Sequence, residues 1–407
     1  MRPKVLVVDN GLYVEFARTL ARSGRFSQVG YFAPFAADFP AARDLAVGAG
    51  FPEIKREYEL FEVLEEYELF AFPDLYWADM QAWAHKNSGG VWGSGRDEYL
   101  EVDREALLRF LKSHKLRLPH YNIYKGLDKV AEWADDGDIV KVNSAFRGDT
   151  ETFRVNLTNL AWQHEIALRL GPLADLTEFI VESPIRDAHE PGFDAIVANG
   201  AFLWPMLLGY EEKDKGYIGR VVEELPEVLD DIRKAIESTL SVTYSNFLST
   251  EVRGKILIDI TTRVPQPPGD AEFAVISNLG EIVRAAATGA KVPEPDYSHA
   301  FVCQLIIIAD DPKRFHGLSV PHELMPFVFM NRAFQVGDVL WTAPQKAESL
   351  LEVGAVVGMG NSEDEAFSEA QRIAKELALP DDLHISDTTV DALKKKLDTA
   401  AAKGFWA

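Results

Sequence analysis

The stretch STEVRGKILIDITTR, residues 249–263, is the part of the sequence that decides the fold. Two runs rich in β-prone residues, 247–253 and 256–261, are separated by the pair Gly254-Lys255. A glycine-containing pair between two such runs is typical of a β-hairpin with a tight turn. Charged residues occupy alternate positions of these strands, so we expect one face of the hairpin to carry charge.

Two acidic residues of this hairpin, Glu251 and Asp259, are candidate metal ligands. They stand eight residues apart around the turn, and we expect them to lie nearly opposite each other on the same face. Facing carboxylates repel, so a cation is needed to keep both ionised. Oxygen ligands without cysteine or paired histidine suit a hard ion such as Mg²⁺, which also binds phosphate oxygens. A solvated face neutralised by Arg253 and Lys255 is an equally open alternative.

A lysine in an apolar strand is the second candidate signal. Lys141 lies within Ile-Val-Lys-Val, residues 139–142, and must either extend to a sheet edge or meet a buried anion. Both interpretations stay open. The following turn offers the guanidinium of Arg147 and the flexible backbone of Gly148, the groups of a loop that closes over phosphates.

The flanking segments predict the organisation of the chain. Short apolar runs alternate with a helical pattern in the first 100 residues, which predicts a parallel sheet. The expected strands are 4–8, 28–32 and 69–72, and the expected first helix is 12–22. Further on, Asn199-Gly200 between residues 193–198 and 202–207 predicts an antiparallel hairpin. Residues 209–217, with Lys213 and Lys215, are expected to form a solvated loop, and the alternative that these lysines and Arg220 reach the terminal phosphate or an acidic substrate stays open.

Composition limits the classes of function. The chain has 407 residues, of which 47% are hydrophobic, enough to bury a core. A formal charge of −22 repels a phosphate backbone, so nucleic acid is not an expected direct partner. The single cysteine, Cys303, allows neither an intrachain disulfide nor a cysteine-based zinc site. Without a long apolar run or a signal peptide, we expect a cytoplasmic protein that makes no membrane contact.

A lysine strand followed by a glycine loop, a strand ending in acidic residues (178–182), and a closing hairpin of the form acid-x-Thr-x-Arg occur here in that order. In this the chain resembles the ATP-grasp superfamily, and more narrowly phage-encoded phosphoribosylamine–glycine ligase-like (glycinamide ribonucleotide synthetase-like) proteins. The resemblance implies an ATP-grasp fold of mixed α/β and α+β class. Its expected parts are an N-terminal parallel α/β (pre-ATP-grasp) domain (1–100), two α+β lobes (101–182 and 183–292) and a small C-terminal domain (293–407).

The resemblance also implies which residues bind the nucleotide. Two cations would contact the phosphates, a mobile loop would cover them, a strand would read adenine, and an acid would bind the ribose. In that order the residues are Arg104 and Lys141, then Arg147 and Gly148, then Glu178, Phe179, Ile180 and Val181, and finally Glu182.

The metal carboxylates of the family correspond to Glu251 and Asp259, and the residues expected to act in catalysis are Arg263 and Lys141. Relatives have asparagine where Thr261 stands, and this difference leaves open whether the site holds one or two metal ions. Asp194 is similar to a family acid whose role varies.

The expected function is therefore an ATP- and Mg²⁺-dependent carboxylate–amine ligase that forms an amide through an acyl phosphate and releases ADP. Its expected partners are a small-molecule carboxylate and amine, and homo-oligomerisation is left open. Three other hypotheses stay open: a small-molecule kinase, a noncatalytic ATP-binding scaffold or regulator, and a protein whose charged hairpin is only surface.

Overall fold

The computed structural model describes residues 2–34, 45–143, 152–187, 189–345 and 351–406. The chain divides into two compact units. The large unit comprises Met1–Asp97, Pro191–Ser249 and Thr261–Ala407, and the small unit comprises Glu98–Glu190 and Thr250–Ile260. The small unit is thus built from two separate segments, and the second is the far end of the hairpin. The division into four domains remains a prediction.

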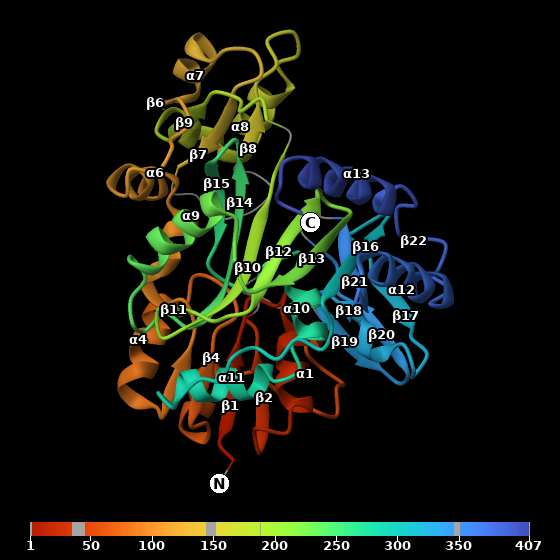
Figure 1. The fold of residues 1–407 in the computed structure, drawn as a ribbon. Helices are drawn as coiled ribbons and strands as arrows, with labels where there is room; N and C mark the ends of the chain where they lie inside the picture. The colour runs from red at the N-terminus through yellow and green to blue at the C-terminus, as the bar shows by residue number, and fades with distance from the viewer. Residues whose placement is uncertain (1, 35–44, 144–151, 188, 346–350, 407) are drawn as a thin grey trace. The chain divides into compact units, whose positions relative to one another are not determined.

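The amino-terminal part of the large unit is a parallel sheet with the strand order β3-β2-β1-β4-β5, of which Figure 1 labels β2, β1 and β4. Its strands confirm the predicted parallel arrangement, and the apolar β1 lies at the centre. The strands are β1 (Lys4–Val8), β2 (Gln28–Phe32), β3 (Lys55–Glu57), β4 (Leu69–Ala71) and β5 (Gly90–Trp92), and the helices are α1 (Val14–Arg22), α3 (Leu60–Val63) and α4 (Ala78–Asn87).

The first helix begins two residues later than the sequence predicts, because Asp9 organises the turn before it. The two carboxylate oxygens of Asp9 accept hydrogen bonds from the backbone of Leu12 at 3.3 Å and of Tyr13 at 2.7 Å. This turn follows the carboxyl end of β1. In open α/β sheets, ligands bind at that edge.

A larger antiparallel sheet continues the large unit, in the order β14-β10-β12-β13-β16-β21-β18, and β15 pairs with β14. Short strands β11 and β22 pair with β10 and β16. The strands are β10 (Gly192–Ala198), β11 (Ala201–Phe202), β12 (Met206–Glu212), β13 (Gly216–Val222), β14 (Asn246–Arg253), β15 (Ile256–Thr261), β16 (Phe301–Ala309), β18 (Val328–Met330), β21 (Glu352–Gly360) and β22 (Leu383–His384).

Both predicted hairpins form, but the expected loop 209–217 is confirmed only at residues 213–215, the turn that carries Lys213 and Lys215, because the residues on either side of it are strand. They belong to the β12–β13 hairpin, in which Gly209 pairs with Gly219. The glycines hide the strand pattern in the sequence, and the structure requires them there. A Cβ atom on Gly209 would lie 2.1 Å from the Tyr217 hydroxyl oxygen, and one on Gly219 would lie 2.8 Å from the Tyr217 ring.

The carboxy-terminal part adds helices and a three-stranded sheet, ordered β17-β20-β19. Helix α12 packs on β21, where Gly358 allows close approach: a Cβ there would lie 2.1 Å from the backbone nitrogen of Ala370. The strands are β17 (His316–Ser319), β19 (Ala333–Val336) and β20 (Val339–Thr342), and the remaining helices of this unit are α9 (Glu227–Glu237), α10 (Gly269–Val275), α11 (Leu279–Ala287), α12 (Glu363–Glu376) and α13 (Thr389–Ala402).

The small unit contains a four-stranded antiparallel sheet in the order β6-β9-β7-β8. Strand β9 is internal and pairs along its length with β6 on one side and β7 on the other. The strands are β6 (Tyr121–Lys125), β7 (Ile139–Val142), β8 (Thr152–Arg154) and β9 (Glu178–Glu182), and the helices are α5 (Tyr99–Val102), α6 (Arg104–Ser113), α7 (Leu127–Trp133) and α8 (Ala161–Leu170).

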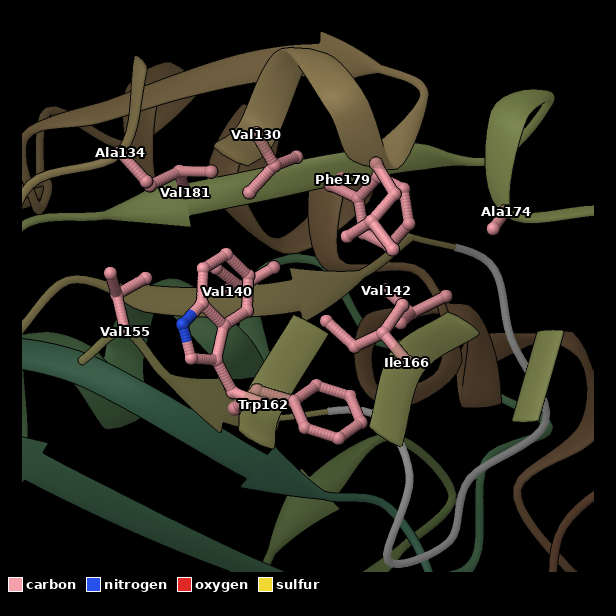
Figure 2. Close-up of a cluster of buried hydrophobic side chains, with 12 residues drawn as sticks. Val130, Ala134, Val140, Val142, Val155, Trp162, Ile166, Ala174, Phe179 and Val181 are labelled. Carbon is pink, nitrogen blue, oxygen red and sulfur yellow. The ribbon is translucent and has the colours of Figure 1, made fainter. Parts of the chain in front are cut away.

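One face of this sheet carries the core of the small unit. Val140 and Val142 of β7 lie in the same buried cluster as Phe179 and Val181 of β9, with Trp162 of α8 among them (Figure 2). Since side chains alternate along a strand, the residues between these point to the opposite face. Lys141, Ile180 and Glu182 therefore share the face that is free of this core.

We predict that Phe179→Ala lowers the free energy of unfolding by about 3–5 kcal/mol, because it empties a fully buried position of an internal strand. Urea denaturation followed by circular dichroism measures this change. Leu168→Ala on α8 is the control, since 85% of that side chain is exposed and its loss should cost about 0.5 kcal/mol or less. Equal losses in the two variants would contradict the assignment of this core.

Candidate active site

Lys141 is a half-buried residue on the core-free face of the small unit. Its position in β7 is fixed by pairing with Thr152 of β8 and Ile180 of β9. The Lys141 Nζ atom lies 3.5 Å from the backbone oxygen of Ile258. Lys141 is thus no edge-strand residue, and it reaches the hairpin that carries Asp259.

Arg104 makes three charge-assisted hydrogen bonds within the small unit. Its Nε and Nη2 atoms donate to the two carboxylate oxygens of Glu182, at 2.6 and 2.8 Å. Its Nη1 atom donates to the backbone oxygen of Ile258 at 2.7 Å. Both side chains are buried. The expected roles of Arg104 on the phosphates and of Glu182 on the ribose need correction, because the two side chains are paired with each other.

The expectation that Phe179, Ile180 and Val181 read adenine through their backbone is wrong. These residues lie in β9, whose backbone groups pair with β6 on one side and β7 on the other. All three side chains are buried, while Glu178 is exposed. The chain leaves the sheet only after Glu182, and residues 184–187 belong to no strand or helix. The proline at position 184, which cannot extend a central strand, was the sequence signal for this exit.

The two acids of the β14–β15 hairpin do not share a face. Both residues of the Gly254-Lys255 turn have positive φ, 57° and 68°, which is the geometry of a two-residue hairpin turn. Such a turn sets Val252 opposite Leu257, and both are only 1% exposed. Alternation then directs Glu251 to the other face, and Asp259 to the same face as Leu257. Facing residues across this turn differ by an odd number, whereas these acids are eight apart.

Asp259 therefore remains as the one hairpin carboxylate on its face, while Glu251 is exposed on the other. In the described part of the chain, no three acidic, histidine or cysteine side chains gather in a way that could hold a metal ion. One carboxylate still fits Mg²⁺, which nucleotide sites hold through one or two carboxylates together with phosphate oxygens and water. The oxygen donor of Asp259 is thus compatible with this ion.

Arg263 belongs to the large unit, at the carboxyl edge of the parallel sheet. Its guanidinium donates to the hydroxyl oxygen of Tyr13, and its Nε lies 3.9 Å from a carboxylate oxygen of Asp74. Tyr13 in turn donates to the backbone oxygen of Val264 at 2.7 Å. The turn after β1 and the segment after β15 are therefore joined, and this cluster was not specified by the sequence.

Asp9, the residue that directly follows β1, is a further carboxyl group at this edge of the sheet, and it is fully buried. Burial and, next, the charge of Asp74 raise the pKa of Asp9 to about 6, although Tyr31, Tyr13 and Leu12 all donate to it. Asp194 of β10 is similar: burial raises its pKa to about 6, and it accepts a 2.5 Å hydrogen bond from Tyr217. These acids hold protons at a pH where ordinary carboxyl groups are ionised.

The loop residues Arg147 and Gly148 lie outside the described residues. Within the described ranges, no helix is long and apolar enough to cross a membrane.

Several solved structures share this fold. Phosphoribosylamine–glycine ligase from Thermotoga maritima is 16% identical, and the match covers 94% of this chain and 97% of that one with a TM-score of 0.67. N5-carboxyaminoimidazole ribonucleotide synthetase from Thermus thermophilus is 11% identical, with 92% and 99% covered and a TM-score of 0.61. L-amino acid ligase from Bacillus licheniformis is 16% identical, with 95% and 99% covered and a TM-score of 0.60.

The expected mixed α/β fold, with a parallel amino-terminal sheet and further antiparallel sheets, is thereby confirmed over more than 90% of the chain. No family model and no curated protein matches the sequence. Identities of 11–16% establish the fold alone, so the activity has to be argued from the site.

We predict that Asp9 makes the protein less stable as the pH rises. Its pKa is about 6 when folded and near 3.8 when unfolded, so its stabilising proton is fully present below pH 3.8 and lost as the pH passes 6. Between pH 4 and pH 8, wild type should lose roughly 2–3 kcal/mol of unfolding free energy relative to Asp9→Asn. Urea denaturation at intervals of one pH unit measures the difference.

The exposed Asp79→Asn on α4 is the control for that experiment, and its curve should run parallel to that of wild type. A curve for Asp9→Asn that also runs parallel to wild type would contradict the raised pKa.

Proposed function

We propose that the protein is an ATP- and Mg²⁺-dependent ligase that joins a small carboxylate to a small amine. The observation that carries this proposal is the approach of Lys141 Nζ to the Ile258 carbonyl, one residue before Asp259. This contact supports a phosphate-binding role for Lys141 beside a metal-binding role for Asp259 within the small unit. The shared fold with ligases over more than 90% of the chain supports the same conclusion.

In this proposal, the residues of the small unit bind the nucleotide. Lys141 neutralises phosphate oxygens, and Asp259 is the side chain that would hold Mg²⁺. When bound, the ion supplies positive charge to the phosphates. Backbone groups of residues 184–187 read adenine, since they lie beyond the paired strand β9. Arg147 and Gly148 retain their proposed role in a loop over the phosphates.

The reaction proposed for this site has two steps. A carboxylate oxygen of the substrate attacks the γ-phosphorus of ATP, the bond to the bridging oxygen breaks, and ADP leaves. The amine then attacks the carbon of the acyl phosphate, phosphate leaves, and the nitrogen releases a proton. Lys141 favours the first step by offsetting charge that accumulates on the transferred group. We assign Arg263, whose guanidinium is partly exposed beside Asp74, to the anionic carboxylate substrate.

A noncatalytic ATP-binding protein is the second candidate function, and a specific observation favours it. With Glu251 on the opposite face, a single hairpin carboxylate is left for the metal, and Thr261 provides a hydroxyl where relatives have an amide. This candidate predicts nucleotide binding without turnover. For either function, we propose that the protein is cytoplasmic and that it is related to phage-encoded ligases.

A screen of small carboxylates and amines for ATP-dependent ADP release tests the proposal. Release should require both substrates and Mg²⁺. Lys141→Ala and Asp259→Asn should each lower the rate at least ~100-fold, because each removes a charge that faces the phosphates. Formation of the amide, followed by mass spectrometry, separates a ligase from a kinase.

Two matched variants control this screen. Glu251→Gln removes a carboxylate from the opposite face of the same hairpin, and Lys129→Ala removes an exposed lysine from α7. Both should stay within about twofold of wild type. Full turnover in Lys141→Ala or Asp259→Asn would overturn the site, and calorimetric binding of ATP without any turnover would favour the second candidate.

A further inference from the structure

We infer that Arg104 is a positioning residue, which fastens the β14–β15 hairpin to strand β9 and thereby fixes the place of Asp259. The inference rests on the proposed function in that Asp259 is taken as the metal ligand. It gives Arg104 a task different from phosphate binding, and it makes Glu182 its structural partner.

The contacts of one guanidinium carry this inference. Two of its nitrogens engage both carboxylate oxygens of Glu182, at the end of β9, at 2.6 and 2.8 Å. The third nitrogen donates to the backbone oxygen of Ile258 in β15 at 2.7 Å. Arg104 thus connects two strands that are far apart in the sequence, and all three contacts lie within the small unit.

The backbone that carries Arg104 is itself held in place. Arg104 is the first residue of α6, and the Asp103 side chain caps this helix by accepting from the backbone of Ala106 at 2.9 Å. The next residue, Glu105, donates from its backbone to the Asn143 side chain, just after β7, at 3.4 Å. The backbone of Arg104 is therefore fixed beside the sheet, and this limits where its guanidinium can lie.

The chemistry of the pair explains why Arg104 is not available to a phosphate. Arg104 is 8% and Glu182 6% exposed, so moving the guanidinium away would leave a buried carboxylate without its counter-charge. The planar fork of arginine reaches both carboxylate oxygens through two nitrogens and the carbonyl through the third, whereas lysine would have to reach all three acceptors from a single nitrogen. Arg104 therefore contributes geometry, whereas phosphate binding is assigned to Lys141 in the proposed function.

The Ile258 carbonyl is the point through which this positioning reaches the site. It accepts from Arg104 and lies 3.5 Å from Lys141 Nζ, and Asp259 follows it directly in the chain. Releasing the carbonyl from Arg104 would loosen the strand on which Asp259 stands. Lys141 would then lose a neighbour that sets the distance between its ammonium and that carboxylate.

Hydrogen exchange in the full-length protein, with Arg104→Lys, tests the inference without any substrate. We expect amides of residues 256–260 to exchange about ten- to a hundredfold faster than in wild type, because a charge-assisted hydrogen bond to the strand is lost. Arg109→Lys is the matched control: it lies on the same helix but is exposed, and its exchange should equal that of wild type. Unchanged exchange in Arg104→Lys would overturn the inference.

Glu182→Gln provides a second variant in case Arg104→Lys does not fold. It keeps the volume of the side chain and one acceptor oxygen, so it should raise the same exchange rates by a smaller factor. Wild-type rates at residues 256–260 in this variant would likewise overturn the inference.

Activity and binding distinguish positioning from direct phosphate contact. For positioning, Arg104→Lys should lower kcat and raise the Mg²⁺ concentration needed for half-maximal turnover about tenfold, while ADP binding without Mg²⁺ changes less than about twofold. A Kd for ADP that rises more than tenfold in the absence of Mg²⁺ would show that Arg104 contacts phosphate, and would overturn the inference. If wild type shows no turnover, the proposed function fails, but the exchange experiment still decides the role of Arg104.

Discussion

The small unit depends on one buried charge pair, in which the guanidinium of Arg104 meets the carboxylate of Glu182. Burying either charged side chain without its partner would cost free energy, so the two are expected to become buried together. Because the same guanidinium also holds a carbonyl of β15, the segment Thr250–Ile260 is attached to the rest of the small unit by a polar contact with strict geometry.

Strand β9 is the second constraint, because it separates two environments. Its side chains toward Val140 and Trp162 are apolar and form the core, and those on the other face include Glu182. The backbone of β9 is hydrogen-bonded to a neighbouring strand on both sides, so a ligand that bonds to backbone groups must do so beyond the end of this strand. The division of labour between core and site therefore follows from the two-residue period of a strand.

Local signals in the sequence predicted much of the fold. The turns Gly254-Lys255 and Asn199-Gly200 form as expected, since a left-handed pair of residues encodes a hairpin without help from the rest of the chain. The same local rule contained the error about Glu251 and Asp259: the even separation of the acids, visible in the sequence, already places them on opposite faces.

Other features could not be read from a single sequence. Arg104 and Glu182 are 78 residues apart, and nothing local indicates that they pair. Whether β9 is internal or at an edge depends on which strands flank it, and both of these, β6 and β7, lie at least 35 residues earlier in the chain. The cluster of Tyr13, Asp74 and Arg263 is likewise made by tertiary contact between segments about 250 residues apart.

The discontinuous make-up of the small unit has a consequence for biosynthesis. Glu98–Glu190 leaves the ribosome well before Thr250–Ile260, and Pro191–Ser249 must be translated in between. During that interval, Arg104 and Glu182 can meet, but the third donor of the guanidinium has no Ile258 carbonyl to bind. The nascent small unit is therefore incomplete until the hairpin emerges. A gene fragment that stops at Glu190 encodes a small unit that lacks the segment Thr250–Ile260.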